Sequence, residues 1–166
     1  MGFFYAYFYQ MKSSEVYTIK EATAKLMRYC AYQERSHYEV EQRLKKYKLT
    51  AVERQEVISN LIKDNFLNEE RFALAFATDK FRLQKWGRIR ISRELKSKQV
   101  SEYLINKALN TIDQNLYLTH FEELFEKRLN SIKESDPFKR KRKIADYLFR
   151  RGYESELIYE RLQDLD

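Results

Sequence analysis

Few residues of this 166-residue chain could carry out covalent or metal chemistry. There is one cysteine, Cys30, and there are two histidines, His37 and His120. A single cysteine excludes an intrachain disulfide, and this set is too small for a tetrahedral zinc site built from Cys and His. Cys30 lies four residues after Leu26, so we expect it in a helix core, and we expect His37 to be exposed. The sequence therefore predicts a protein that is not an enzyme, with no metal and no cofactor.

Basic side chains are the residues whose spacing does indicate a function. The net charge is +7, but residues 80–100 hold eight bases against one acid and residues 139–151 hold seven against one, so the rest of the chain is acidic. Two positive segments on an acidic body are typical of a surface that meets nucleic acid or acidic protein. The residues predicted to make this contact are Lys85, Trp86, Arg88, Arg90, Arg93, Lys96, Lys98, Lys139, Arg140, Lys141, Arg142, Lys143, Arg150 and Arg151.

Each basic run also has a simpler interpretation. Charged residues on a helix often form only a solvated face, and the stems of Lys and Arg cover apolar neighbours. Two runs at equivalent positions favour the functional interpretation, because stacking could merge them into one patch. Trp86 either stacks on a base or anchors a partner, or it fills a junction inside the protein.

The elements that position these side chains are expected to be helices. The chain has only three glycines and one proline, too few for a β-sandwich, a small barrel or a glycine-rich phosphate-binding loop. Gly87 and Gly152 fall in gaps between apolar periodic segments, where we expect helices to stop. The predicted fold is all-α, with helices near 19–32, 37–47, 51–64, 69–85, 88–98, 102–112, 114–133, 137–151 and 155–164.

Capping residues mark the beginnings of these helices. A Ser or Thr followed three residues later by Glu satisfies free backbone groups at a helix N-terminus. Such boxes predict three starts, and single caps or a cap before proline predict four more. The boxes pair Thr18 with Glu21, Ser36 with Glu39 and Thr50 with Glu53, and the other caps are Asn68, Ser101, Asp113 and Asp136.

The predicted helices form an internal repeat. Leu44, Leu95 and Leu148 each begin the pattern of a leucine, four mostly polar residues, an apolar residue and a cap, at intervals of 51 and 53 residues. A period near 50 built from three short helices indicates stacked units. We expect three tandem three-helix repeats, 18–66, 67–112 and 113–166, that form an elongated, curved array.

Residues 1–17 precede these repeats and are rich in aromatic side chains. They lack the basic start and the cleavage site of a signal peptide. They are either an extension or a mis-assigned start, or an aromatic arm that packs on the domain or on a partner. No apolar stretch is long enough to cross a membrane.

Four motifs in this order resemble the signatures of the RecX regulatory proteins from about residue 20 to the C-terminus. The chain departs from the family pattern in two places: it has Lys85-Trp86-Gly87-Arg88 where the family often has Gly-Tyr-Gly-Pro, and Ser92 replaces a frequent arginine, for which Arg93 could substitute. Arg71 could be either a contact or an internal ion-pair residue. The motifs are Arg35-Ser36-x-x-Glu39-Val40-x-x-Arg43-Leu44, Phe66-Leu67-Asn68-Glu69-x-Arg71-Phe72-Ala73, Trp86-Gly87-x-x-Arg90-Ile91-x-x-Glu94-Leu95 and Lys143-Ile144-x-x-Tyr147-Leu148-x-Arg150-Arg151-Gly152-Tyr153.

The resemblance implies a cytoplasmic, non-enzymatic modulator of the RecA recombinase. Such a protein would bind the RecA filament on DNA and inhibit its ATPase, strand exchange and co-protease activity in recombination, DNA repair and the SOS response. A monomer without membrane attachment is expected. One alternative is a general helical module that binds single- or double-stranded DNA without RecA, and another is an adaptor that uses its apolar repeat ends.

Overall fold

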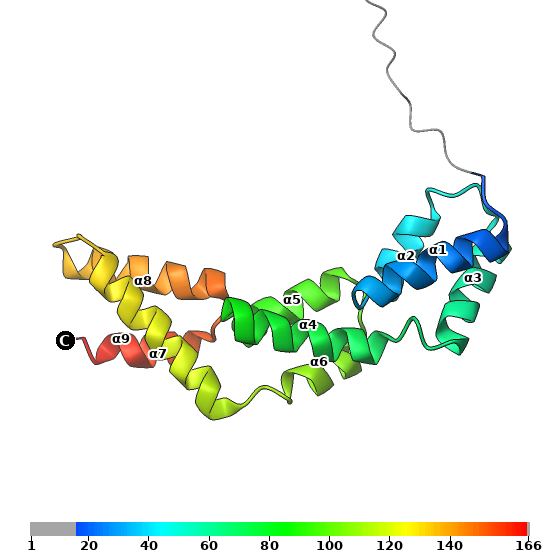
Figure 1. Ribbon diagram of the computed structural model, residues 1–166. Helices are drawn as coiled ribbons and strands as arrows, with labels where there is room; N and C mark the ends of the chain where they lie inside the picture. Colours follow the sequence, from blue (N-terminus) through cyan, green and yellow to red (C-terminus); the bar gives the residue numbers. More distant parts are fainter. Residues whose placement is uncertain (1–15, 166) are drawn as a thin grey trace, which may run out of the picture.

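The computed structural model describes residues 16–165, and within this range the chain forms nine α-helices (Figure 1). All nine begin at the predicted residues, and their ends lie within three residues of the predicted ones. The all-α prediction is confirmed. The helices are α1 (Ile19–Tyr32), α2 (His37–Leu44), α3 (Ala51–Lys63), α4 (Glu69–Gln84), α5 (Arg88–Ser97), α6 (Glu102–Leu109), α7 (Gln114–Ser131), α8 (Pro137–Arg151) and α9 (Ser155–Gln163). Most of the predicted N-terminal extension, residues 1–15, lies outside the described range.

Side-chain caps explain why the helix beginnings could be predicted. In all three capping boxes the Ser or Thr side chain accepts from the N3 backbone amide and the N3 glutamate accepts from the cap amide. The side chains of Asn68, Ser101, Asp113 and Asp136 accept from the same position in α4, α6, α7 and α8. These bonds satisfy amides that a helix leaves unpaired, so they fix each start locally.

The two glycines between helices have different roles. Gly152 ends α8 with φ +89°, the left-handed conformation expected of a glycine stop. Gly87 lies in the gap between α4 and α5, as predicted, but it is not the residue that stops α4: Lys85 ends that helix with φ +51°, and Gly87, at φ −75°, is the N-cap of α5. Gly87 is required for a different physical reason, the close approach of another backbone described below.

The helices group into three consecutive triplets that form an elongated, curved array, as predicted (Figure 1). The second helices of the triplets, α2, α5 and α8, follow one another along the upper, inner edge of the arc in Figure 1. Their anchor residues Leu44, Leu95 and Leu148 are fully buried. The repeat pattern therefore places α5 and α8, which carry most of the predicted contact residues, along the same side of the molecule.

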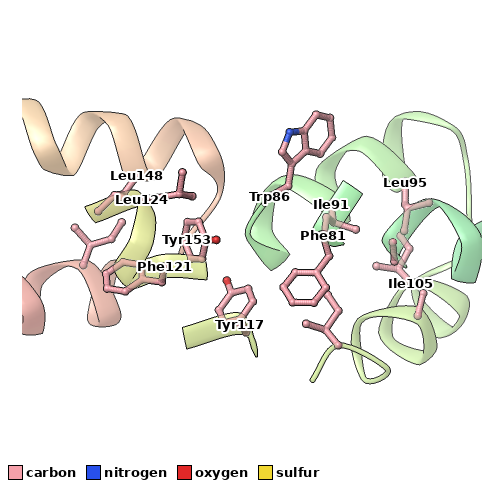
Figure 2. Close-up of a cluster of buried hydrophobic side chains, with 14 of the residues drawn as sticks. Phe81, Trp86, Ile91, Leu95, Ile105, Tyr117, Phe121, Leu124, Leu148 and Tyr153 are labelled. Carbon is pink, nitrogen blue, oxygen red and sulfur yellow. The ribbon is translucent and has the colours of Figure 1, made fainter. Parts of the chain in front are cut away.

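The second and third repeats share one hydrophobic core, whereas the first repeat has its own. The shared core runs from Phe72 in α4 to Leu162 in α9, and Figure 2 shows its aromatic centre around Phe81, Tyr117 and Tyr153. The core of the first repeat extends from Ala22 to Leu67. The stacking of units that the repeat period indicates is therefore confirmed for the second and third repeats.

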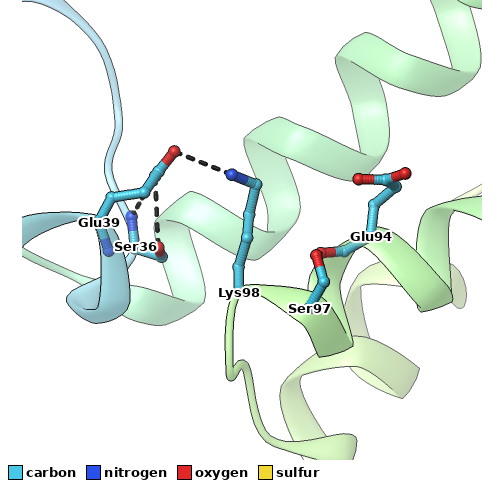
Figure 3. Close-up of polar contacts among 5 residues, drawn as sticks. All are labelled: Ser36, Glu39, Glu94, Ser97 and Lys98. Atoms are coloured by element: carbon cyan, nitrogen blue, oxygen red, sulfur yellow. Dashed lines mark hydrogen bonds and ion pairs between the residues drawn. The ribbon is translucent and has the colours of Figure 1, made fainter. Parts of the chain in front are cut away.

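Ion pairs connect the first repeat to the second. Nζ of Lys98, just after α5, lies 2.9 Å from Oε1 of Glu39, which also caps α2 (Figure 3). Nε of Arg71 lies 2.6 Å from Oε1 of Glu34, and the same guanidinium also donates to Asn65. These polar bonds therefore cross between two separate cores.

Candidate basic interaction surface

The beginning of α5 meets the end of α8 through their backbones. The Gly87 amide donates to the Arg151 carbonyl at 2.8 Å, and the Ile89 amide donates to the Gly152 carbonyl at 3.0 Å. A Cβ on Gly87 would lie only 2.1 Å from the Gly152 carbonyl oxygen. The two basic helices are therefore held together at a contact that only glycine permits.

The hydroxyl of Tyr117, in α7, links the beginning of α5 to the residues that follow α8. Its hydroxyl donates to Oε2 of Glu154 at 2.6 Å and accepts from the backbone amide of Arg88 at 3.2 Å. The ring is buried, and this burial, with the Glu154 hydrogen bond, raises the pKa of the Tyr117 hydroxyl, which stays protonated. The Arg88 guanidinium packs 4.1 Å from the Tyr117 ring centre and donates to Gln114 at 2.8 Å.

Further predicted contact residues take part in the same junction. Arg151 donates to the Gln84 carbonyl at 2.9 Å, and the Tyr153 hydroxyl donates to the Lys85 carbonyl at 3.1 Å. The Lys85 ammonium pairs with Glu123 of α7. Together with Arg88, the Lys85 and Arg151 side chains join the second repeat to the third.

Trp86 packs inside the protein, although its ring contacts, Phe76, Lys80 and Arg90, all belong to the second repeat. Its side chain is only 9% exposed and belongs to the shared core, with its ring edge toward Phe76 at 6.5 Å. Arg90 lies 3.8 Å from the indole ring and also donates to the Arg150 carbonyl at 3.3 Å. In this structure the indole is covered by a cation and a core rather than open to a base.

Other predicted contact residues form pairs at the edges of α5 and α8. Lys96 pairs with Glu102 at 2.8 Å, and Lys98 forms the inter-repeat bond to Glu39. Arg140 donates to the Leu129 carbonyl at 3.2 Å, and Lys141 is half-buried.

Four exposed bases, Arg93, Lys139, Arg142 and Arg150, have no side-chain ion pair or hydrogen bond within residues 16–165. Lys143 is also exposed, although it reaches Glu134 at 2.7 Å.

Residues 139, 143 and 150 share one helix face because their spacing is four and seven. When Leu95 is aligned with Leu148, Arg93 falls on the corresponding face of α5. We call Arg93, Lys139, Lys143 and Arg150 the exposed basic face.

The structure also shows where the cysteine and the two histidines lie and how far each is buried. Cys30 is buried, as expected, and burial raises the pKa of its thiol to about 11. His120 is buried with its ring 4.9 Å from Phe81, and burial lowers the pKa of its imidazole. His37, in the first turn of α2, is half-buried, so the expectation that it is exposed was wrong.

Sequence reasoning missed the residues that hold the surface together. Tyr117 and Glu154 are 37 residues apart, and nothing in either local sequence indicates that they bond to each other. Arg71 is resolved as an internal ion-pair residue by its bond to Glu34. Among the described residues, no cluster of three His, Cys, Asp or Glu side chains could hold a metal ion, and no helix could span a membrane.

The helices and their grouping define an all-α protein built from three-helix repeats. Family models match two of its three helical units: "RecX, second three-helix domain" matches residues 68–109, and "RecX, third three-helix domain" matches residues 116–162. The chain belongs to the RecX family of regulatory proteins.

Relatives and solved structures agree with this assignment. The "Regulatory protein RecX" of Bacillus cytotoxicus is 27% identical over 147 residues, and that of Bacillus cereus strain B4264 is 26% identical. Each alignment covers 89% of this chain but 54% of the relative, so the chain spans about half the length of these curated relatives.

Two crystal structures share the fold. RecX from Lactobacillus salivarius has a TM-score of 0.78 and 23% identity, over 89% of this chain and 96% of the other. A second regulatory protein RecX has a TM-score of 0.79 and 18% identity, over 88% and 73% of the two chains.

Proposed function

We propose that this chain is a non-enzymatic regulator that binds the RecA filament on DNA and inhibits RecA ATPase, strand exchange and co-protease activity. The observation that carries the proposal is the exposed basic face, because three of its four bases, Arg93, Lys139 and Arg150, make no side-chain bond within residues 16–165. Membership of the RecX family supports RecA as that partner. The chain spans about half the length of its curated relatives, so the activity requires a direct test on this chain.

The shape of the array supports binding to a filament rather than to a single small ligand. The exposed bases are distributed over α5 and α8, whose mutual orientation is held by Gly87 and Gly152. Contacts spread along a rod can engage neighbouring subunits at once, and the second contact then forms at high effective concentration. A filament that presents phosphate or acidic protein groups along its length suits this distribution of charge.

The direct test is ATP hydrolysis by the cognate RecA on single-stranded DNA while this protein is titrated. We expect hydrolysis to fall at amounts of protein below one per RecA subunit, because one bound rod would contact several subunits. Unchanged hydrolysis up to equal amounts would refute the proposal.

Variants of the exposed basic face test the site separately. The triple change Arg93→Glu, Lys139→Glu and Arg150→Glu should raise the amount needed for half-inhibition by about tenfold or more, because three attractive contacts become repulsive. These side chains make no bonds within the described residues, so helix content and thermal stability should stay close to wild type.

A matched control carries the same change of net charge elsewhere. Lys20, Lys63 and Lys133 are exposed, lie outside α5 and α8, and make no side-chain bond within residues 16–165. The triple change of these lysines to Glu should leave half-inhibition nearly unchanged. If both triple variants lose inhibition equally, overall charge rather than the exposed basic face is responsible.

A second candidate function is DNA binding without RecA, which the same exposed bases favour. Three phosphate contacts on duplex DNA predict a slope of log affinity against log salt near −2.7, from about −0.9 per contact. Gel shifts with duplex and single-stranded DNA distinguish the two functions. Tight, strongly salt-dependent binding in the absence of RecA would favour this second function.

A further inference from the structure

Two arginines of the first repeat converge on one tyrosine ring. The guanidinium carbon of Arg35, in the loop before α2, lies 4.0 Å from the ring centre of Tyr29. The guanidinium carbon of Arg43, in α2, lies 4.6 Å from the same ring centre. The two positive charges therefore cannot be farther apart than the sum of these two distances.

No acid of the described chain neutralises this pair of arginines. Neither side chain forms an ion pair or a hydrogen bond within that part of the chain, and Nε of Arg35 is buried without a partner. The neighbouring acids pair with other bases, Glu34 with Arg71 and Glu39 with Lys98. Two like charges held this close repel each other, and a bound anion would offset that repulsion.

The internal repeat shows which part of this arrangement belongs to the fold. When the anchor leucines of α2 and α5 are aligned, Tyr29 corresponds to Lys80 and Arg35 corresponds to Trp86. Lys80 lies 5.0 Å from the ring centre of Trp86, so the second repeat has the same contact with the ring and the cation exchanged. One contact of a cation with a ring at this position is therefore a structural feature of the repeat.

The second cation on the ring differs between the two repeats. In the second repeat it is Arg90, which also donates to the Arg150 carbonyl and so helps to join two repeats. In the first repeat it is Arg43, which comes from a different position and makes no such bond within the described residues. The residues aligned with Arg43 are Glu94 and Tyr147, so the stacking of units does not require a base there.

The chemistry of this pair suits an oxyanion. A guanidinium that stacks on a ring keeps its N–H groups directed outward in its own plane, where they can donate two parallel hydrogen bonds to phosphate or carboxylate oxygens. Arg43 is exposed, so a partner can reach it. The Tyr29 ring also restricts both side chains before anything binds, which lowers the entropy cost of binding.

We propose that Arg35 and Arg43 form a phosphate-binding site in the first repeat, at which both guanidinium groups bind one phosphate of a nucleic-acid backbone. Helix α2 follows the same inner edge of the array as α5 and α8 (Figure 1), so a strand bound at the exposed basic face could continue to this site. Phosphates repeat along a strand, which suits basic sites that are spread along a rod. The site deepens the function proposed above by naming a nucleic-acid contact, and its test uses no RecA, so the two proposals can fail separately.

The test is fluorescence anisotropy with a labelled single-stranded oligonucleotide at several salt concentrations. Arg35→Gln and Arg43→Gln should each weaken binding about fivefold, and the double variant about tenfold rather than the product of about 25-fold, because both arginines hold the same phosphate. The slope of log affinity against log salt should become shallower by about 0.7 in the double variant, the value for one phosphate on a single strand. The matched control is Lys20→Gln with Lys63→Gln, which removes two exposed charges of the first repeat and should change the affinity by less than about twofold.

Three outcomes would overturn the proposal. If the two single effects multiply in the double variant, the arginines bind separately, and if the control loses as much affinity as the double variant, only overall charge matters. A polyglutamate peptide that binds wild type more tightly than the oligonucleotide, and loses this binding in the double variant, would show that the pair takes carboxylates of an acidic protein. Circular dichroism checks the fold of each variant, and Arg43→Gln decides the test if the Arg35 variants unfold, because Arg43 is exposed: unchanged binding by this variant refutes the site.

Discussion

Gly87 and Gly152 face each other so closely that a Cβ on Gly87 would lie 2.1 Å from the Gly152 carbonyl oxygen. A Cβ on Gly152 would lie 2.3 Å from the Cβ of Arg90. The two residues are 65 positions apart, and their contact brings the first turn of α5 against the last turn of α8. The relative position of α5 and α8 therefore depends on glycine, which has no Cβ, at both position 87 and position 152.

Gly87→Ala should destabilise the protein, because the added methyl group meets backbone that cannot move without breaking the hydrogen bonds of the junction. We expect the free energy of unfolding to fall by about 2 kcal/mol. For a domain of this size that corresponds to a fall in Tm of about 4–8 °C. Thermal unfolding followed by circular dichroism measures the change. Asn106→Ala, at an exposed position of α6, is the control, and an unchanged Tm for Gly87→Ala would contradict the structure.

Tyr117→Phe should weaken the same junction without adding bulk. The change leaves the Glu154 carboxylate without the phenol hydrogen and the Arg88 amide without an acceptor, so the free energy of unfolding should fall by about 1.5–3 kcal/mol. Denaturant unfolding measures this loss. Tyr103 of α6 is 71% exposed, so Tyr103→Phe should have an effect close to zero. Equal effects of the two changes would show that the Tyr117 hydroxyl makes no stabilising bond.

The bond between Glu39 and Lys98 should make stability depend on pH. Burial acts to raise the pKa of Glu39, but hydrogen bonds from Lys98 and from the Ser36 backbone outweigh it and hold the pKa below the ordinary value of 4.5. The folded state therefore favours the carboxylate, so this contribution is complete above pH 4.5 and is lost as pH falls through the lower folded pKa. Lys98→Met should lower the free energy of unfolding by about 0.5–1 kcal/mol at neutral pH.

The measurement compares Lys98→Met with wild type by urea unfolding across this acidic range. The difference between the two should shrink as Glu39 becomes protonated. Lys96→Met is the matched control, because the Lys96 pair with Glu102 is largely exposed, with side-chain exposures of 55% and 79%. A difference that stays constant down to pH values well below 4.5 would show that the pair contributes nothing.

Cys30 should react very slowly with alkylating reagents in the folded protein. Its thiol has a pKa of about 11, against an ordinary value of 9.0, and only the thiolate reacts. The two-unit difference predicts alkylation by iodoacetamide about a hundredfold slower than in the unfolded chain, before burial slows it further. Mass spectrometry of timed samples, with and without denaturant, measures both rates. Similar rates in the two conditions would show that the thiol is not buried.

The sequence predicted the helices well because their starts are determined locally. A cap such as Ser36 and its partner Glu39 are three residues apart, so the bonds that begin α2 require no distant segment. The anchors Leu44, Leu95 and Leu148 likewise reveal the repeat through spacing alone. The predicted helix ends are less accurate than the starts, and Lys85 rather than Gly87 adopts the left-handed conformation that ends α4.

The candidate surface was predicted only in outline. The two basic segments were identified from charge, but the sequence treated all their bases alike. Lys85, Arg88 and Arg151 join repeats, and Lys98 holds the first repeat to the second. The structure leaves Arg93 among the exposed bases with no bond inside the described range, and the role of this surface in binding stays a prediction.

The sequence by itself determined the all-α class, the helix starts and the threefold repeat, because caps and apolar spacing act within a few residues. Only the tertiary structure decided which repeats share a core and which bases are used internally. Those outcomes depend on pairs such as Tyr117 with Glu154 and Gly87 with Gly152, which come together through packing over tens of residues. No local sequence pattern predicts such pairs, because the bonding groups become neighbours only when the helices have stacked.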